Sequence, residues 1–205
     1  MNIVRLALEN QHRDDVLQRL VAGAAQGDAD AFLGAAVQLT WAGGWAAALP
    51  GLLALETMPS VIQDAFQAAW CSSASDAFGL KRTLTLDLLG QDHLLADGLA
   101  LLLPAPSDSM PTLLYRAQSL QDYRAGRVGC WWTPERELAT SLWLVTSAAS
   151  EHVGDHVLLA TQASAGAVIC GTPDDLDIVL DPRLLQSVRV VGVRRNDPEA
   201  DKIAA

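Results

Sequence analysis

Three short runs decide the fold of this chain: Leu-Tyr-Arg at residues 114–116, Gly-Cys-Trp-Trp-Thr-Pro at 129–134, and Leu-Asp-Ile-Val-Leu-Asp-Pro at 176–182. Each is a brief apolar or aromatic run bounded by Gly, Pro or Asp, which is typical of short β-strands. In chain order they carry an arginine, a Trp-Thr pair and a carboxylate. On neighbouring strands these residue types could together hold a phosphorylated ribosyl cofactor, because a guanidinium binds phosphate well.

The second half of the chain has the pattern of short strands around one helix. Pro134 lies at a favoured first-turn position, and Glu135 and Glu137 follow at the positive end of a helix predicted to reach about residue 148. The predicted strands are Thr112–Arg116, His156–Thr161, Ala167–Cys170, Leu176–Leu180 and Ser187–Val193.

The first hundred residues are predicted to be helical because their apolar residues recur at three- and four-residue spacing. Asp28 or Asp30 is a candidate N-cap for the second helix, Asp92 is one for the last, and Pro50 predicts an irregularity or a boundary. The predicted helices are Asp14–Ala25, Ala31–Ala42, Trp45–Leu55, Val61–Trp70 and two more that end at Leu103-Pro104, the last being Leu94–Leu103.

A stretch rich in Pro, Ser and Asp at residues 104–111 separates these two patterns. We therefore predict a helical N-terminal region at 1–104, an α+β domain of short mixed or antiparallel strands at 105–193, and a flexible tail at 194–205. The predicted fold class is α+β.

Composition excludes several classes of function. Half of the residues are apolar and 19% are charged, as in a globular protein, and the net charge of −10 argues against binding nucleic acid. The widely spaced Cys71, Cys130 and Cys170 indicate neither a disulfide framework nor a zinc site, and they suit small core residues. We expect a cytoplasmic protein, because no signal peptide is apparent. Residues 31–55 lack charge, but their Ala, Gly and Pro content favours two buried helices over contact with a membrane.

In the order and spacing of the three runs quoted above, the chain resembles proteins of the ADP-ribosyltransferase fold, and in particular bacterial members with a helical N-terminal region. The resemblance covers roughly residues 104–193. It rests on Pro104, on Leu-Tyr-Arg, on Gly-x-x-Trp-Thr followed by a helix, and on an acidic-apolar-apolar-x-Asp-Pro strand. It implies NAD as a substrate, transfer of ADP-ribose to an unknown acceptor or NAD glycohydrolysis, and an effector-like or toxin-like role.

The resemblance also assigns roles to residues. Arg116 would bind the phosphates and the adenosine-side ribose of NAD, and Trp132 and Thr133, with Trp131, would line the nicotinamide end. Asp177 would be the catalytic carboxylate that stabilises the cationic ribose as nicotinamide leaves. Asp175 would lie two residues earlier on the same strand face.

The chain departs from the proteins that it resembles at two of these positions and at the residue after Arg116. Many relatives have Gly where Ala117 stands, Ser where Trp131 stands, and Glu where Asp177 stands. An aspartate reaches about 1.5 Å less far than a glutamate, and a misplacement near 1 Å costs on the order of a hundredfold in rate. The alternative function is therefore a catalytically inactive protein of this fold that binds or regulates a partner.

Simpler interpretations stay open beside these. Arg116 fits an ion-paired arginine at the end of a strand, the two tryptophans fit core aromatics, and Asp177 fits an edge or turn carboxylate. No metal site is expected: the acidic residues at 174–177 lack the glycine and the final glutamate of a calcium loop, and His152 and His156 flank a glycine in a turn.

Overall fold

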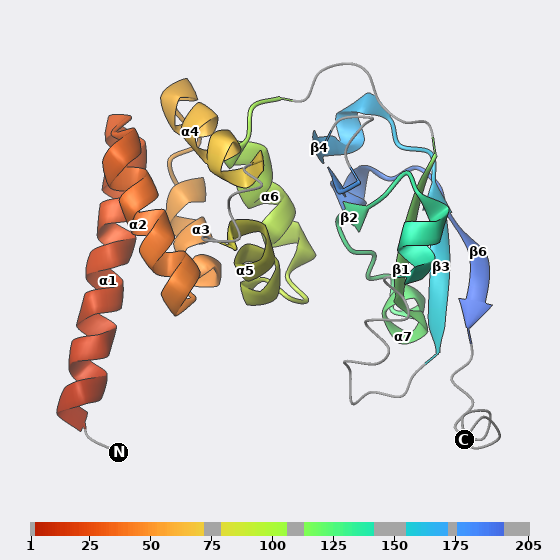
Figure 1. The fold of residues 1–205 in the computed structure, drawn as a ribbon, viewed down its shortest axis with the longest axis horizontal. Helices are drawn as coiled ribbons and strands as arrows, with labels where there is room; N and C mark the ends of the chain where they lie inside the picture. The colour runs from red at the N-terminus through yellow and green to blue at the C-terminus, as the bar shows by residue number, and fades with distance from the viewer. Residues whose placement is uncertain (1–2, 72–78, 106–112, 142–154, 172–175, 195–205) are drawn as a thin grey trace. The chain divides into compact units, whose positions relative to one another are not determined.

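The computed structural model describes residues 3–71, 79–105, 113–141, 155–171 and 176–194. The chain divides into two units, Met1–Ala105 and Pro106–Ala205, which are taken in turn (Figure 1). The first unit is helical in its described residues, and the second combines strands with short helices. The predicted α+β class is therefore confirmed.

Most helices of unit 1 follow the predicted pattern, but the first begins at Ile3 rather than at Asp14. Asp28 is the N-cap of the second helix, where its carboxylate accepts the backbone N–H of Ala31 at 3.0 Å. Of the two alternatives at Pro50, the boundary is wrong, because the third helix continues through this residue. Gln91, rather than Asp92, is the cap residue of the last helix. The helices are α1 (Ile3–Gln26), α2 (Ala29–Ala42), α3 (Trp45–Leu53), α4 (Ser60–Cys71), α5 (Leu80–Asp87) and α6 (Asp92–Leu102).

An aromatic cluster forms the centre of unit 1. The ring of Phe66 on α4 lies edge-on to Phe32 and to Trp45, at centroid distances of 6.4 and 6.3 Å, and stacks on Trp70 at 5.9 Å. These rings come from α2, α3 and α4, so the cluster ties together three consecutive helices. All four side chains are buried.

The turn between α2 and α3 depends on a carboxylate from α5. Gly43 and Gly44 have φ values of 73° and 132°, which favour glycine. The backbone N–H groups of Gly44 and Trp45 both donate to Oδ2 of Asp87, at 2.8 and 3.0 Å. Asp87 thus serves as the N-terminal cap of α3 although it is 42 residues away from Trp45.

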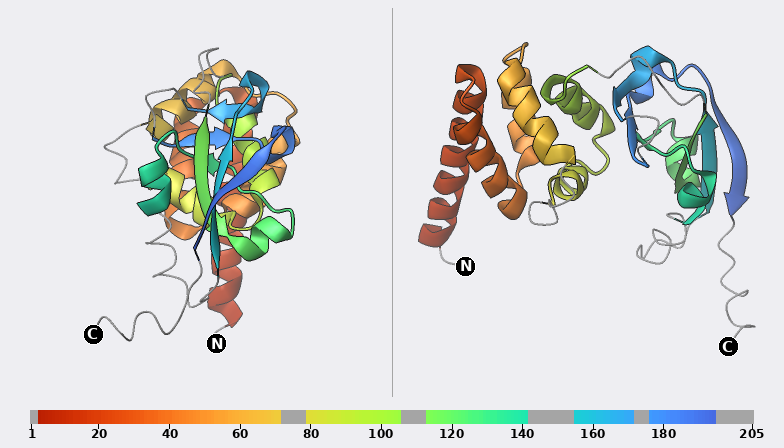
Figure 2. Two further views of the ribbon diagram at one scale, coloured as in Figure 1. Left: turned by 90° about the vertical axis from the view of Figure 1, so that its right-hand side faces the viewer. Right: turned by 45° about the horizontal axis from the view of Figure 1, so that its top comes forward.

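The described residues of unit 2 form two small antiparallel sheets. One has the strand order β1 (Leu114–Ser119), β3 (His156–Thr161) and β6 (Val188–Arg194), which lie side by side in Figure 2. The other has the order β2 (Trp131–Trp132), β5 (Ile178–Leu180) and β4 (Val168–Cys170). Leu114 and Leu159 from the first sheet share a core cluster with Trp132 and Ile178 from the second. The remaining elements are α7 (Leu120–Arg124), η2 (Ala165–Ala167) and η3 (Pro182–Leu184).

Several predicted boundaries in unit 2 were wrong. β1 continues to Ser119, so Arg116 lies inside its strand and does not end it; the extension exists because residues 117–119 pair with β3. The short helix α7, which Ser119 caps through its hydroxyl, was not predicted. Leu176 and Asp177 precede β5 and are not part of it, and the described part of the helix after Pro134 covers 136–141.

Within the described residues, no helix combines the length and the apolar character needed to cross a bilayer. The segment 31–55, for which membrane contact was the alternative, forms α2 and α3 of unit 1, with Phe32, Trp45 and Leu52 fully buried.

Replacing Asp87 with alanine should destabilise unit 1, because two backbone N–H groups lose their acceptor. We expect a loss of about 1–2 kcal/mol in the free energy of unfolding. Hydrogen exchange of α3 peptides, detected by mass spectrometry, measures this loss of stability. Asp64→Ala is the matched control, since Asp64 is exposed on α4 and alanine favours helix. Equal protection of α3 in both variants would contradict the capping role.

Candidate functional site

The three runs that decide the fold come together where the two sheets of unit 2 meet. Tyr115 and Thr133 exchange two backbone hydrogen bonds, with Tyr115 N–H donating at 2.7 Å and Thr133 N–H donating at 2.9 Å. On the other side of β2, Trp132 lies opposite Ile178 of β5. We call this junction of β1, β2 and the start of β5 the seam. It makes neighbours of residues that are widely separated along the chain.

Arg116 is half-buried, and its guanidinium is bonded to Gln118 of its own strand and to the first residue of β2. Nε donates to Oε1 of Gln118 at 2.9 Å, and Nη1 donates to the carbonyl of Trp131 at 2.8 Å. The guanidinium also lies so close to Gly129 that a Cβ at that position would overlap it. Glycine at 129 is therefore a steric requirement for this placement of Arg116.

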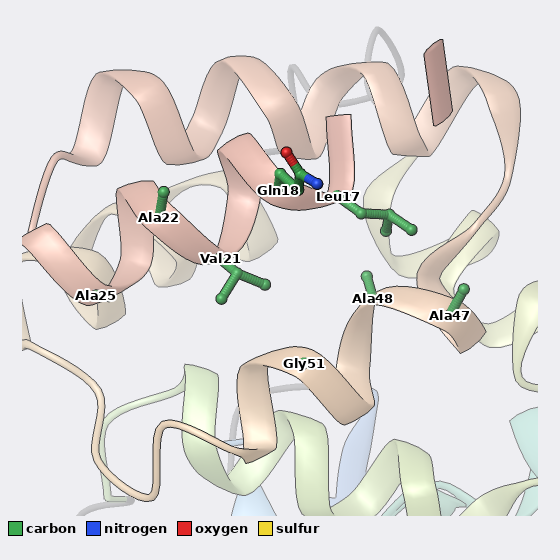
Figure 3. A pocket seen from close by; sticks show the side chains of 8 residues that line it. All are labelled: Leu17, Gln18, Val21, Ala22, Ala25, Ala47, Ala48 and Gly51. Carbon is green, nitrogen blue, oxygen red and sulfur yellow. The ribbon is translucent and has the colours of Figure 1, made fainter. Parts of the chain in front are cut away.

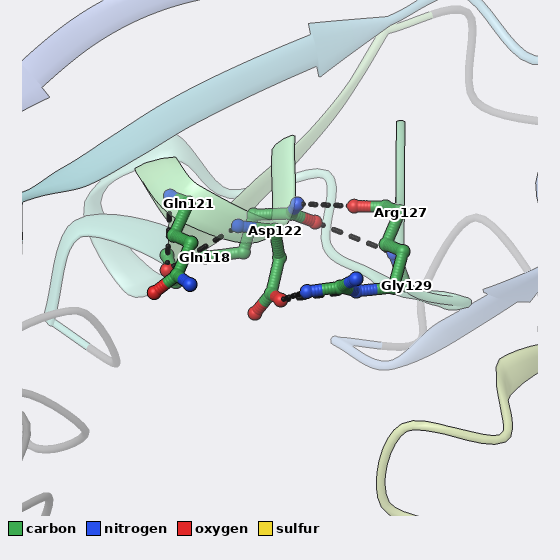
Figure 4. A network of polar contacts seen from close by, with 6 residues as sticks. Gln118, Gln121, Asp122, Arg127 and Gly129 are labelled. Atoms are coloured by element: carbon green, nitrogen blue, oxygen red, sulfur yellow. Dashed lines mark hydrogen bonds and ion pairs between the residues drawn. The ribbon is translucent and has the colours of Figure 1, made fainter. Parts of the chain in front are cut away.

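Gln118 connects β1 to the backbone of residues 127–129, which precede β2. It was not predicted as a site residue. Its Oε1 also accepts the N–H of Gly129 at 3.3 Å, and its Nε2 donates to the carbonyl of Arg127 at 2.7 Å. Figure 4 shows this amide beside the loop that Arg127 and Asp122 hold with an ion pair of 2.5 Å. The only sequence signal was that Gln118 is polar and lies two positions after Arg116. The predicted strand ended at Arg116, so Gln118 was placed beyond it.

Trp132 and Thr133 are held by the fold itself. The Trp132 ring is 2% exposed within the core cluster of unit 2, and its Nε1 donates to the carbonyl of Gly129 at 3.1 Å. Thr133 is 4% exposed, and its hydroxyl accepts the N–H of Glu135 at 3.2 Å, just before the helix at 136–141. Both side chains therefore stabilise β2 and the turn that follows it.

Asp177 is exposed and immediately precedes β5. Continuing the β2–β5 register by one residue would place it opposite Thr133, because Trp132 lies opposite Ile178. Asp175, the second carboxylate that the resemblance implied, lies outside the described residues, as do Asp174 and His152. Among the residues that the structure describes, no group of three His, Cys, Asp or Glu side chains is placed to hold a metal ion.

The predicted residues meet at one seam but do not line one face. Successive residues of a strand point to opposite faces. Thr133 lies opposite Tyr115, so these two share a face, and continuing the β2–β5 register by one residue would put Asp177 on it as well. Arg116 leaves β1 on the other face, the face of Leu114 and the main core cluster. Its guanidinium nevertheless reaches the backbone of β2 at Trp131.

Unit 1 offers a cavity of a different character. A groove of about 420 Å³ lies between α1 and α3, lined mostly by small or apolar residues such as Val21, Ala48 and Gly51 (Figure 3). Among its described lining residues, Gln18 is the one with a polar side chain. Because these residues include no acid, base or nucleophile, they supply no chemistry for a reaction. The seam in unit 2, where the predicted residues meet, is the candidate site.

Neither a protein-family model, nor a curated protein, nor a solved structure matches this chain. The seam must therefore be judged by its own geometry and chemistry.

Replacing Gly129 with alanine should destabilise unit 2 by about 1–3 kcal/mol, because the new methyl group displaces the Arg116 guanidinium or the backbone beneath it. Hydrogen exchange of β1 and β2 peptides measures the loss. Gly166→Ala is the control: an added Cβ there meets nothing within 4 Å, so unit 2 should keep its stability.

The double variant Arg116→Ala/Gly129→Ala tests whether the loss of stability in Gly129→Ala comes from the clash with Arg116. Removing the guanidinium should cancel most of the Gly129→Ala penalty, because the clashing group is gone. A penalty of the same size in both backgrounds would show that Arg116 is not what requires glycine at position 129.

Proposed function

We propose that unit 2 binds NAD at the seam and either transfers its ADP-ribosyl group to an acceptor or hydrolyses the bond to nicotinamide. One observation carries this proposal: the arginine strand, the Trp-Thr strand and the segment with the carboxylate are consecutive in space as β1, β2 and β5. These are the three elements that the resemblance to ADP-ribosyltransferases requires to be neighbours, and they are far apart in the sequence.

The residues at the seam suit the two chemically distinct parts of NAD. A guanidinium is planar and presents five N–H donors, which allows it to bind the oxygens of a diphosphate in pairs. A carboxylate at Asp177 would stabilise the positive charge that develops on the ribose as nicotinamide leaves. The diphosphate and the nicotinamide ribose lie at different places along NAD, so Arg116 and Asp177 would hold different parts of it.

The second candidate is a protein of the same fold that binds a ligand or a partner without turnover. The structural roles of the other predicted residues favour this candidate. The Thr133 hydroxyl accepts a backbone N–H, and the Trp132 ring is buried in the core. Asp177 also has a shorter reach than the glutamate of the relatives.

A titration with NAD, followed by an assay for released nicotinamide, distinguishes these functions. We expect NAD to bind in the micromolar to low millimolar range and to release nicotinamide, with Arg116→Ala weakening the binding about tenfold or more. Arg124→Ala is the matched control, because Arg124 is exposed at the end of α7. Failure of the wild type to bind millimolar NAD would eliminate the enzyme proposal, and binding without release would support the second candidate.

Asp177 should control the rate of the reaction and have little effect on the affinity for NAD. For an active wild type, Asp177→Asn should lower kcat by about a hundredfold or more, because the charge that stabilises the cationic ribose is lost. Asp177→Glu should raise kcat if reach limits the reaction. Glu137→Gln removes an exposed carboxylate from the helix at 136–141 and should leave kcat unchanged. A kcat that is insensitive to Asp177→Asn would contradict the assigned role.

A further inference from the structure

Gln118 is a polar side chain at the seam that makes three hydrogen bonds. It is 9% exposed and lies on β1, where its neighbours in the first sheet are apolar residues of β3. Burying an amide is costly unless its donors and acceptor find partners. Here Oε1 accepts from Arg116 and Gly129, while Nε2 donates to the carbonyl of Arg127.

The partners of Gln118 fix the orientation of its amide. Two of them, Nε of Arg116 and the N–H of Gly129, are donors only, and the third is a carbonyl that only accepts. Rotating the amide by half a turn would bring its NH₂ against two donors and its oxygen against a carbonyl oxygen. The amide therefore has one favourable orientation, and that orientation presents its oxygen to the guanidinium.

This oxygen sets the orientation of Arg116 in turn. Arg116 and Gln118 are two residues apart on β1, so their side chains leave the strand on the same face. The guanidinium is held between Oε1 of Gln118 at Nε and the Trp131 carbonyl at Nη1, which fixes its plane. Paired binding of phosphate oxygens depends on the orientation of that plane, and a guanidinium held in place loses less entropy when it binds.

We propose that Gln118 is a positioning residue for NAD binding, which acts by orienting the Arg116 guanidinium toward the diphosphate. This inference rests on the proposed function, and it adds a residue that the resemblance does not assign. Gln118 itself would not touch the reacting atoms. Its effect on NAD should therefore pass entirely through Arg116.

A double-mutant cycle on the affinity for NAD tests this dependence. Gln118→Leu removes all three hydrogen bonds while keeping a side chain of similar size, and it should weaken NAD binding about tenfold. In the Arg116→Ala background the same substitution should have almost no further effect. Gln121→Leu is the control, because Gln121 is exposed on α7 and should leave the affinity unchanged. An equal loss in both backgrounds would show a general structural effect and would overturn the inference.

A measurement on the free protein separates this inference from the proposed function. In the wild type, the Nε–H of Arg116 should exchange slowly with water in NMR spectra, because it donates to Gln118. The exchange should become fast in Gln118→Leu. If the wild type binds NAD but neither the affinity nor this exchange changes in Gln118→Leu, the inference is wrong while the proposed function stands. If the wild type does not bind NAD, the proposed function fails, and the exchange rate still decides whether Gln118 holds the guanidinium.

Gln118→Glu keeps the test decisive if the leucine variant does not fold. A carboxylate still accepts from Arg116 and Gly129, so the Nε–H of Arg116 should stay protected. Its second oxygen replaces the donor to the Arg127 carbonyl, so unit 2 should lose some stability. The added negative charge would partly neutralise the guanidinium, and NAD should bind more weakly. Unchanged affinity for NAD in this variant would argue against a role of the oriented guanidinium in holding the diphosphate.

Discussion

The second unit depends on one pair of backbone hydrogen bonds, those exchanged by Tyr115 and Thr133. They join β1 of the first sheet to the residue that follows the short strand β2 of the second. β2 has only two residues, Trp131 and Trp132, and such a strand has little stability by itself. It gains partners on both sides, from β1 through this bridge and from β5 through its ladder. Side chains then reinforce the junction, with Arg116 and Gln118 bonded to the backbone of the segment 127–131.

This reinforcement explains the residue choice around the junction. Gly129 lacks the Cβ that would collide with the Arg116 guanidinium, and its carbonyl accepts the indole N–H of Trp132. Polar groups buried at such a place are stable only when all of them are bonded. The seam is therefore a structural element whether or not it binds NAD. A ligand that used Arg116 would exploit a guanidinium that the fold already holds in place.

The sequence predicted the elements better than their contacts. The helices α2, α3, α4 and α6 and the strands β3 to β6 were located to within a few residues, because apolar periodicity and breaks at Gly, Pro and Asp are local signals. The start of α1 was missed, since the helix begins at Ile3 rather than at Asp14. The extension of β1 to Ser119 could not be predicted, because it comes from pairing with β3, almost forty residues further along the chain. The capping of α3 by Asp87 and the bonds of Gln118 were missed for the same reason. Arg116 and Thr133 were predicted to act at one place, and their strands do meet. Their side chains lie on different faces, and this follows only from the register of β1 with β2, in which Tyr115 lies opposite Thr133.

The central claim is that the seam is where NAD binds, and mapping of backbone amide signals by NMR during an NAD titration tests it most directly. The account predicts that the largest shifts fall at residues 115–118, 131–133 and 177–178, which belong to β1, β2 and the start of β5. Shifts confined to unit 1, or the absence of any shift at millimolar NAD, would contradict it.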